Sequence, residues 1–197
     1  MPIPACYCAL HATEEAVAAF ISCAKELDYG DDAKINIRDH QAKATVSLIV
    51  QIIVKALRPL NLAIAFDPKS DAIIARYDLK GEQVYAPAKA ELLCFLADEH
   101  SAVVDFFDYA IQSFGGVTNL TNEVKRGQDI RNKIFYASND GVPTGFIDPV
   151  KCFERECQVS LSLIWACIDM SRNNRIKIPI ISQALRTANI VIKELKG

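Results

Sequence analysis

Polar residues recur every three to four positions through the longest apolar stretch of the chain, which runs from Asp39 to Arg58. These polar positions are Lys43, Ser47, Gln51, Lys55 and Arg58. β-Branched residues fill much of the remainder, but one polar stripe at this spacing is typical of a helix buried on its other sides. Asp39 is a plausible N-cap, and Pro59 cannot continue the helix. We therefore predict a helix over residues 39–58 despite its strand-like composition.

The same period predicts five further helices, which are bounded by breakers and capping residues. The expected ranges are Thr13 to the stop at Gly30, Pro87 to Phe114 before Gly115-Gly116, Thr121 to Ser138, Asp148-Pro149 to about Ser171, and Ser182 to Lys196 after Pro179. A breaker-rich loop is expected over residues 139–145.

Residues 62–85 have a pattern typical of β-strands. Two extended runs, Leu62–Phe66 and Ala72–Tyr77, flank the turn-forming residues Asp67–Asp71, and Leu79–Tyr85 follows as an extended piece. The prediction is a mainly α, single-domain protein spanning residues 1–197. It is a bundle of about six helices with a minor β-hairpin near residues 62–77.

The composition of the chain excludes some classes of partner but identifies none. The chain has 197 residues, a formal net charge of −2 and 51% hydrophobic residues, so no global positive field indicates nucleic acid. The first residues lack the pattern of a signal peptide, and polar residues interrupt every apolar stretch before membrane length. We expect a soluble protein with no membrane partner.

The seven cysteines are scattered through apolar helical stretches, which suits buried thiols in a reducing cytoplasm. Cys6, Cys8 and His11 could be drawn as metal ligands, but no second Cys/His pair follows at zinc-ribbon spacing. Glycine-rich phosphate loops, zinc-protease helices and nucleophile elbows are also missing from the sequence. We expect no cofactor and no metal. A weaker alternative is a metal-dependent enzyme built on His11, His40 and His100.

Arg131 interrupts the apolar face of the helix predicted over residues 121–138. Burial of a guanidinium is costly unless the group is paired with a carboxylate or bound to an anion. Two interpretations follow. Either Arg131 is structural, reaching the rim of the core or pairing with an acidic residue, or it binds a phosphate of RNA or of a nucleotide.

The segment Arg131-Asn132-Lys133-Ile134-Phe135-Tyr136 resembles the motif of the HEPN superfamily. These helical bundles include metal-independent ribonucleases of toxin and phage-defence systems, and they carry an Arg, often followed by Asn, with a His about five positions later. The Glu14-Glu15 and Asp39-His40 helices are also similar to the opening helices of abortive-infection members. The chain departs from the pattern at Tyr136, which occupies the position of the family's His.

The resemblance implies an RNA- or nucleotide-binding domain in the cytoplasm, a homodimer, and altered or lost ribonuclease catalysis. In it, Arg131 would stabilise the phosphate charge, Asn132 would orient the phosphate, and Tyr136 or a neighbouring His would handle the proton. Further binding residues are expected at Glu15, His40 and Lys133.

The alternative is a non-enzymatic helical interaction protein that dimerises through an apolar helix face. An open groove containing Arg131, Asn132 and Tyr136 would favour the phosphate site, whereas Arg131 buried against Glu15 or Asp98 would favour the interaction protein.

Overall fold

The computed structural model describes residues 2–57, 63–69, 72–79, 81–87, 96–97, 103–104, 106–135, 148–172, 174–175 and 177–197. These residues are mainly helical, as predicted. They form α1 (Pro2–Glu26), α2 (His40–Leu57), α3 (Phe106–Phe114), α4 (Val117–Phe135), α5 (Pro149–Arg172) and α6 (Pro179–Lys196). A 3-10 turn, η1 (Asp31–Ala33), follows α1.

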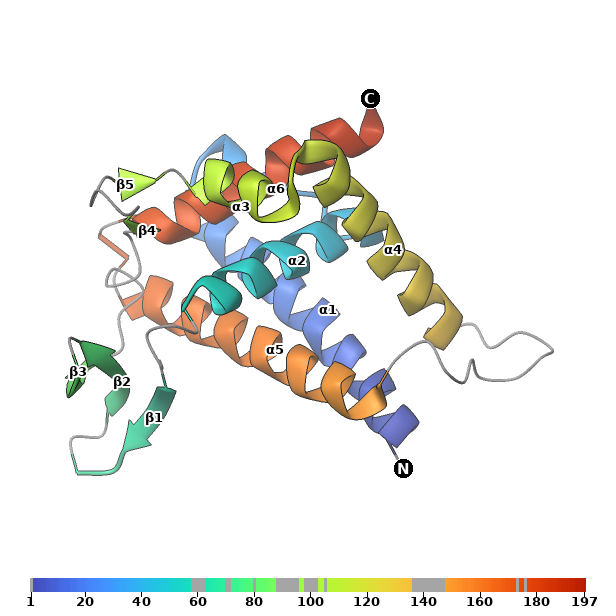
Figure 1. Ribbon diagram of the computed structural model, residues 1–197. Helices are drawn as coiled ribbons and strands as arrows, with labels where there is room; N and C mark the ends of the chain where they lie inside the picture. Colours follow the sequence, from blue (N-terminus) through green and yellow to red (C-terminus); the bar gives the residue numbers. More distant parts are fainter. Residues whose placement is uncertain are drawn as a thin grey trace.

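Helix α2 lies at the centre of the bundle and contacts α1, α4, α5 and α6 (Figure 1). Its apolar residues Val46, Ile49, Val50 and Ile52 are buried. The Asp39 carboxylate accepts hydrogen bonds from the amides of Gln41 and Ala42, at 2.9 and 3.3 Å. The predicted helix and N-cap are therefore confirmed, while Arg58 and Pro59 lie outside the described residues. Neighbours on several sides explain how a β-branched segment stays helical: tertiary burial outweighs differences in helix propensity of a few tenths of a kcal/mol per residue.

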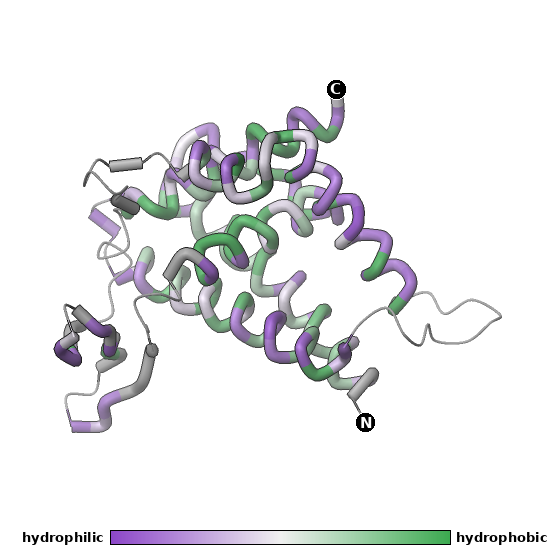
Figure 2. The backbone as a smooth tube through the Cα atoms, in the orientation of Figure 1, coloured by the Kyte–Doolittle hydropathy of each residue, from purple (hydrophilic) through white to green (hydrophobic). Residues whose placement is uncertain are grey.

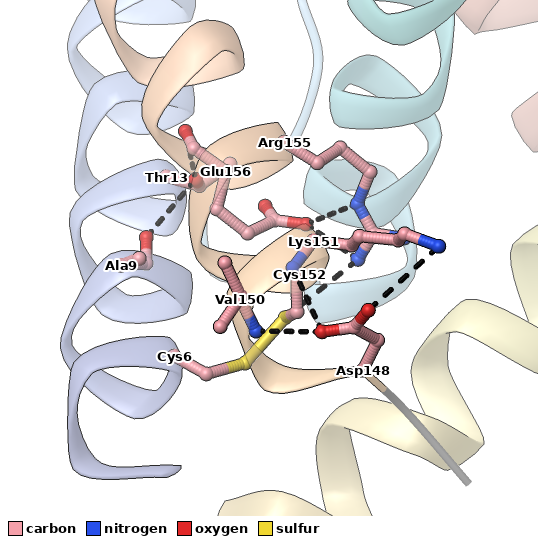
Figure 3. Close-up of a disulfide and its surroundings, with 9 residues drawn as sticks. All are labelled: Cys6, Ala9, Thr13, Asp148, Val150, Lys151, Cys152, Arg155 and Glu156. Carbon is pink, nitrogen blue, oxygen red and sulfur yellow. Dashed lines mark hydrogen bonds and ion pairs between the residues drawn. A yellow bond between two sulfur atoms is a disulfide. The ribbon is translucent and has the colours of Figure 1, made fainter. Parts of the chain in front are cut away.

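Helices α1 and α5 run parallel and side by side, and their contacts are the most extensive between any two described elements. Cys6 and Cys152 form a disulfide near the N-terminal ends of the two helices (Figure 3). Cys23 lies against the backbone of Cys167 near their C-terminal ends. Between these points the Thr13 hydroxyl lies 3.1 Å from the Glu156 carbonyl oxygen and 3.0 Å from the Ser160 hydroxyl. A polar seam thus fixes the register of the pair inside an otherwise apolar core.

The disulfide corrects the expectation that the cysteines are all thiols. The Cα atoms of Cys6 and Cys152 are 5.9 Å apart, a separation that a disulfide spans. The two residues are far apart in sequence, and only the parallel packing of α1 and α5 brings them together. The same bond occupies the Cys6 sulfur, which the sequence had offered as one of three possible metal ligands.

Three helices begin earlier than predicted. Helix α1 starts at Pro2 instead of Thr13, since proline is tolerated in a first turn and Cys6 and Ala9 are buried there. Helix α4 starts at Val117 instead of Thr121, and Leu120 in its first turn is fully buried. Helix α6 starts at Pro179 instead of Ser182, with the proline at its first position.

The predicted hairpin is confirmed and extends into a three-stranded antiparallel sheet. Strand β1 (Ala63–Asp67) pairs with β2 (Ala72–Leu79), which pairs with β3 (Glu82–Pro87). Gly81, with a positive φ of 86°, turns the chain between β2 and β3. Leu62, Ser70 and Asp71 lie outside the described residues.

The helix predicted from Pro87 to Phe114 is wrong at the residues described before α3 and correct over α3 itself. Pro87 ends β3, at the edge of the sheet where a missing amide is tolerated. Further on, β4 (Leu96–Ala97) pairs with β5 (Val103–Val104), and among the described residues of this range only α3 is helical. At residues 103–104 the helical spacing of polar residues did not decide the structure, because β-branched Val103 and Val104 favour an extended backbone.

Helix α4 is the most hydrophilic of the described helices (Figure 2). Within the described part of the chain, no helix combines the length and the apolar character needed to cross a membrane.

Candidate functional site

Arg131 is held by a carboxylate from another helix. Its Nε donates to Glu14 Oε1, and its Nη2 donates to Glu14 Oε2 at 3.1 Å, so that the α4 guanidinium and the α1 carboxylate form a two-point ion pair. The side chains of Arg131 and Glu14 are only 12% and 15% exposed. Both side chains also contact His40, the first residue of α2, so the ion pair lies at the N-terminal end of that helix.

His40 is the solvent-facing member of this group. Arg131 Nη2 lies 3.1 Å from His40 Nδ1, and Glu14 Oε1 lies 3.5 Å from the same atom. A guanidinium can only donate, so a hydrogen bond to Arg131 requires an unprotonated Nδ1 and places the proton of the neutral ring on Nε2. The His40 side chain is 53% exposed, which leaves the imidazole accessible to a ligand. Asp39 caps α2 immediately before His40 and thereby fixes the position of the imidazole.

Phe135 closes the other side of Arg131. The guanidinium carbon lies 4.5 Å from the centroid of the Phe135 ring, a cation–π arrangement. The His11 ring packs edge-on against the same ring at 4.3 Å between centroids, and Tyr7 packs against both. An exposed second imidazole is therefore attached to the Arg131 cluster through Phe135. We call His11, Glu14, His40, Arg131 and Asn132 the arginine cluster.

The electrostatics of the arginine cluster favour an ionised Glu14. Burial by itself would raise the pKa of this carboxyl, but the hydrogen bond and charge of Arg131, with contributions from His40 and Lys43, outweigh burial and lower the pKa. Glu14 is therefore charged at neutral pH and neutralises Arg131. Lys43, half-buried on α2, leaves the neighbourhood with a positive balance when both imidazoles are neutral.

The predicted site residues divide into three groups. Arg131, Asn132 and His40 come together: Arg131 Nη1 donates to Asn132 Oδ1 at 3.0 Å, in addition to its contact with His40. Glu15 is exposed, and no described contact links it to Arg131. Lys133 is also exposed and lies about 200° around α4 from Arg131 at 100° per residue. Tyr136 lies outside the described residues.

The acidic partner of Arg131 is Glu14, so the choice of Glu15 was wrong. Consecutive helical residues point about 100° apart, and Glu14 shares its face with the buried residues Val17 and Ile21. Glu15 instead precedes Ala19 on the exposed side. A charge on the buried face of α1 and another on the buried face of α4 was the signal in the sequence that could have identified this pair.

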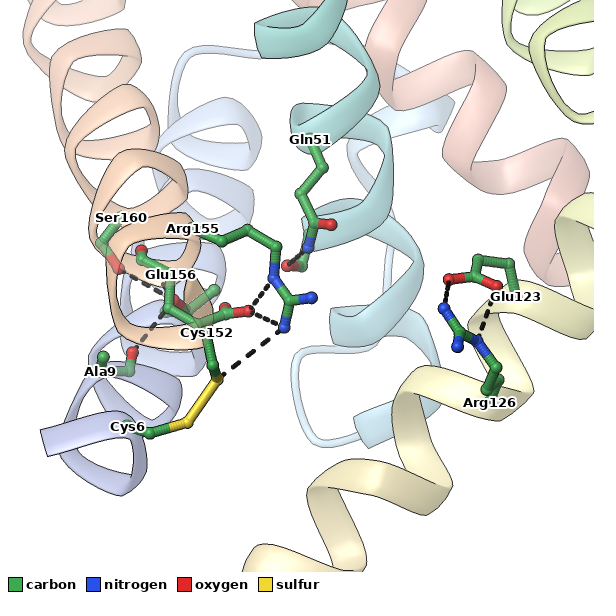
Figure 4. Close-up of polar contacts among 11 residues, drawn as sticks. Cys6, Ala9, Gln51, Glu123, Arg126, Cys152, Arg155, Glu156 and Ser160 are labelled. Carbon is green, nitrogen blue, oxygen red and sulfur yellow. Dashed lines mark hydrogen bonds and ion pairs between the residues drawn. A yellow bond between two sulfur atoms is a disulfide. The ribbon is translucent and has the colours of Figure 1, made fainter. Parts of the chain in front are cut away.

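A shallow cleft of about 250 Å³ opens elsewhere, between α2, α3, α4 and α5. Its lining consists of Leu48, Gln51, Ile52, Val54, Lys55, Phe114, Glu123, Arg155, Gln158 and Val159. Figure 4 shows Arg155 and Gln51 on one side of this region and the Glu123–Arg126 pair on the other. Glu156, 4% exposed, binds Arg155 Nη2 at 2.7 Å, so this guanidinium also has a carboxylate partner. Glu123 precedes Arg131 by two turns of α4, about 12 Å at 1.5 Å per residue, so the cleft and the arginine cluster are distinct.

The described residues contain no group of three His, Cys, Asp or Glu side chains that could hold a metal ion. His40 contacts Arg131, whereas His11 contacts Phe135 from a different helix, and His100 lies outside the described part of the chain. Comparisons with known proteins found no matching family model, no matching curated protein and no matching solved structure, so the function proposed below rests on the residues themselves.

Proposed function

We propose that the arginine cluster binds the phosphate backbone of RNA or of a nucleotide, in the manner of a HEPN-like domain. The observation that carries the proposal is the exposed His40 imidazole, held through Nδ1 by Arg131 so that an Nε2 proton is available for donation. A ring oriented in this way can donate to a phosphate oxygen. The neighbouring Lys43 supplies positive charge for an anion, since Glu14 already neutralises Arg131.

The role of Arg131 in this proposal differs from the expected one. Four described hydrogen bonds and an aromatic ring already occupy the guanidinium, and its side chain is mostly buried. Arg131 is therefore a positioning residue that orients His40, while His40 contacts the phosphate. Asn132, exposed beside it, is placed to hydrogen-bond the ligand from the same turn of α4.

Cleavage requires a base as well as an acid, and His11 is the candidate base on the described surface. In the balanced step, His11 takes the proton of the ribose 2′-hydroxyl, O2′ forms a bond to phosphorus, and the 5′-oxygen leaves and takes a proton from water. The neutral His40 ring donates a hydrogen bond from Nε2 to a phosphate oxygen and keeps its proton. Binding is the primary proposal, and cleavage is its extension.

The test is a gel-shift and cleavage assay with single-stranded RNA, comparing the parent with His40→Ala, His40→Gln and Lys55→Ala. We expect His40→Ala to weaken binding about tenfold, since one charge-assisted contact is lost, with an unchanged melting temperature because the ring is half exposed. Binding by the parent should fall as salt is added. Lys55 lines the cleft, so Lys55→Ala is the matched control and should bind RNA normally.

Three results would contradict the phosphate site. Equal RNA binding by parent and His40→Ala would exclude His40 as a contact, and a loss confined to Lys55→Ala would move the site to the cleft. If neither the parent nor Tyr136→His, which restores the family's imidazole, binds or cuts RNA, the ribonuclease-relative proposal fails.

The second candidate function is a non-enzymatic interaction protein. The burial of Arg131 against Glu14 favours this second function. An arginine whose charge is already paired with a carboxylate has a structural role, whereas a ligand-binding arginine keeps its donors free. The second function requires an apolar surface for a partner, which α5 supplies. A cytoplasmic location belongs to both candidates as a prediction, and cell fractionation tests it.

A further inference from the structure

Large apolar side chains line the outer face of α5. Val150, Phe153, Leu161, Ile164 and Ile168 are all exposed, with Leu161 at 66%, and they account for most of the large exposed apolar residues of the described chain. Together with half-buried Cys157 they recur at intervals of three and four residues, which places them on one side of the helix. We call these six residues the α5 stripe.

The middle of the α5 stripe is free of charge. Residues 157–168 include no acidic or basic side chain, and the polar residues Gln158 and Ser162 lie beside the stripe, not on it. From Val150 to Ile168 the stripe is about 27 Å long at 1.5 Å per residue. In Figure 1 helix α5 forms the lower edge of the bundle, where a partner can approach it. Contiguous exposed apolar patches of this kind mark interaction sites, whereas isolated exposed side chains do not.

Opposite charges mark the two ends of the stripe. Glu154 and Arg172 are exposed and are about five helical turns apart, so they project on nearly the same side as Leu161 and Ile168. Neither of them has an ion-pair partner among the described residues. Their arrangement is self-complementary: when two α5 helices meet antiparallel about a two-fold axis near residue 163, Glu154 of each copy faces Arg172 of the other.

The apolar residues fit the same register. With the axis half a residue away, between residues 162 and 163, Leu161 lies opposite Ile164 of the second copy and Cys157 lies opposite Ile168. Spacings of three and four residues are those with which antiparallel helices interdigitate. We propose that the α5 stripe is the interface of an antiparallel homodimer of this chain, closed at both ends by Glu154–Arg172 ion pairs. This dimer does not depend on the proposed RNA function.

The test is sedimentation velocity over a concentration series from about 1 to 100 µM, a range in which typical specific complexes assemble. The parent should be a dimer. Leu161→Asp should weaken the dimer at least about a hundredfold, since it places a carboxylate against Ile164 twice across the axis. Tyr85→Asp, which alters another large exposed residue outside α5, is the matched control and should leave the dimer intact.

Charge-reversal variants test whether the partner on the α5 stripe is a second copy of this chain or another molecule. Glu154→Arg and Arg172→Glu should each weaken the dimer about tenfold by placing like charges together, and the double variant should restore the parent's behaviour. Thermal melts should show that every variant is folded, because all these positions are exposed. A monomeric parent throughout the concentration series, or a double variant as weak as the single ones, would overturn the proposal. His40→Ala should sediment like the parent, so failure of RNA binding and failure of the dimer are distinguishable.

Discussion

At the scale of single residues, the Arg131–Glu14 pair combines two charges from separate helices with very little exposure to solvent. Such a pair contributes less to stability than its Coulomb attraction suggests, because both groups lose their hydration. Removal of one partner is a different matter, since the remaining charge is left buried without compensation. The pair therefore acts as a constraint on how α1 and α4 pack, whatever the cluster binds.

Arg131→Ala should lower the free energy of unfolding by about 3 to 5 kcal/mol, because it strands the ionised Glu14. The matched control is Arg126→Ala. Arg126 also contacts its carboxylate partner, Glu123, through two nitrogens, but it lies on the surface with its side chain 68% exposed (Figure 4). The control should cost less than about 1 kcal/mol. Urea unfolding of both variants measures the difference, and equal losses would show that Arg131 is not a buried partner.

The lowered pKa of Glu14 predicts a pH dependence of stability. A carboxyl whose pKa is lower in the folded than in the unfolded state stabilises the fold fully above its unfolded value, here near 4.5, and loses this effect as the pH falls through the folded value. Glu14→Gln should therefore be less stable than the parent at pH 7. The gap in melting temperature should narrow below pH 4.5. A gap that stays constant in acid would mean that the charge of Glu14 is irrelevant.

At the scale of elements, α2 shows how one helix serves both packing and the candidate site. Its buried residues form the centre of the core, its polar stripe carries Lys43 towards Glu14, and its N-cap positions His40. Lys196 of α6 reaches the same cap residue, with Nζ 2.8 Å from Asp39 Oδ2. The start of α2 is thus tied to the last turn of the protein's final helix.

Ile49→Asp should unfold the protein or destabilise it by more than about 4 kcal/mol, because an unpaired carboxylate would enter the core. Ile49 is fully buried on α2. Lys55→Asp, on the exposed stripe of the same helix, is the control and should shift stability by no more than about 0.5 kcal/mol. Circular dichroism during thermal unfolding measures both. An unchanged melt for Ile49→Asp would mean that the wrong face of α2 is assigned to the core.

At the scale of the whole molecule, the Cys6–Cys152 disulfide links the beginning of the chain to α5 across a sequence separation of 146 residues. Closing so long a loop restricts the unfolded chain, which is the main way in which a disulfide stabilises a fold in the chain-entropy view. The bond also holds together the two helices that carry Glu14 and the α5 stripe.

Reduction with dithiothreitol should lower the free energy of unfolding by about 2 to 5 kcal/mol, and Cys6→Ser should reproduce that loss without reductant. Cys8→Ser is the control because Cys8 is an exposed thiol two residues away. It should melt like the parent and should remain sensitive to dithiothreitol. Equal melts of the parent with and without reductant would argue against a stabilising disulfide.

The sequence by itself determined the elements whose patterns are local. Periodic burial predicted α2 and most of α1, α5 and α6, and turn residues predicted the β1–β2 hairpin, because each pattern reflects neighbours within a few residues. The same reasoning failed at residues 96–97 and 103–104, where polar spacing suited a helix but the described backbone pairs as strands. Helical spacing of polar residues cannot exclude a strand where β-branched residues favour an extended backbone.

Only the tertiary structure decided which distant side chains meet. Sequence reasoning singled out Arg131 because its charge falls on an apolar face, yet it named Glu15 or Asp98 as the acidic partner where the fold supplies Glu14, and it did not foresee His11 beside Phe135. It also treated Cys6 and Cys152 as separate thiols. The physical reason is the same in each case: helical period specifies which way a side chain points, whereas the rotation and register of packed helices specify what it touches.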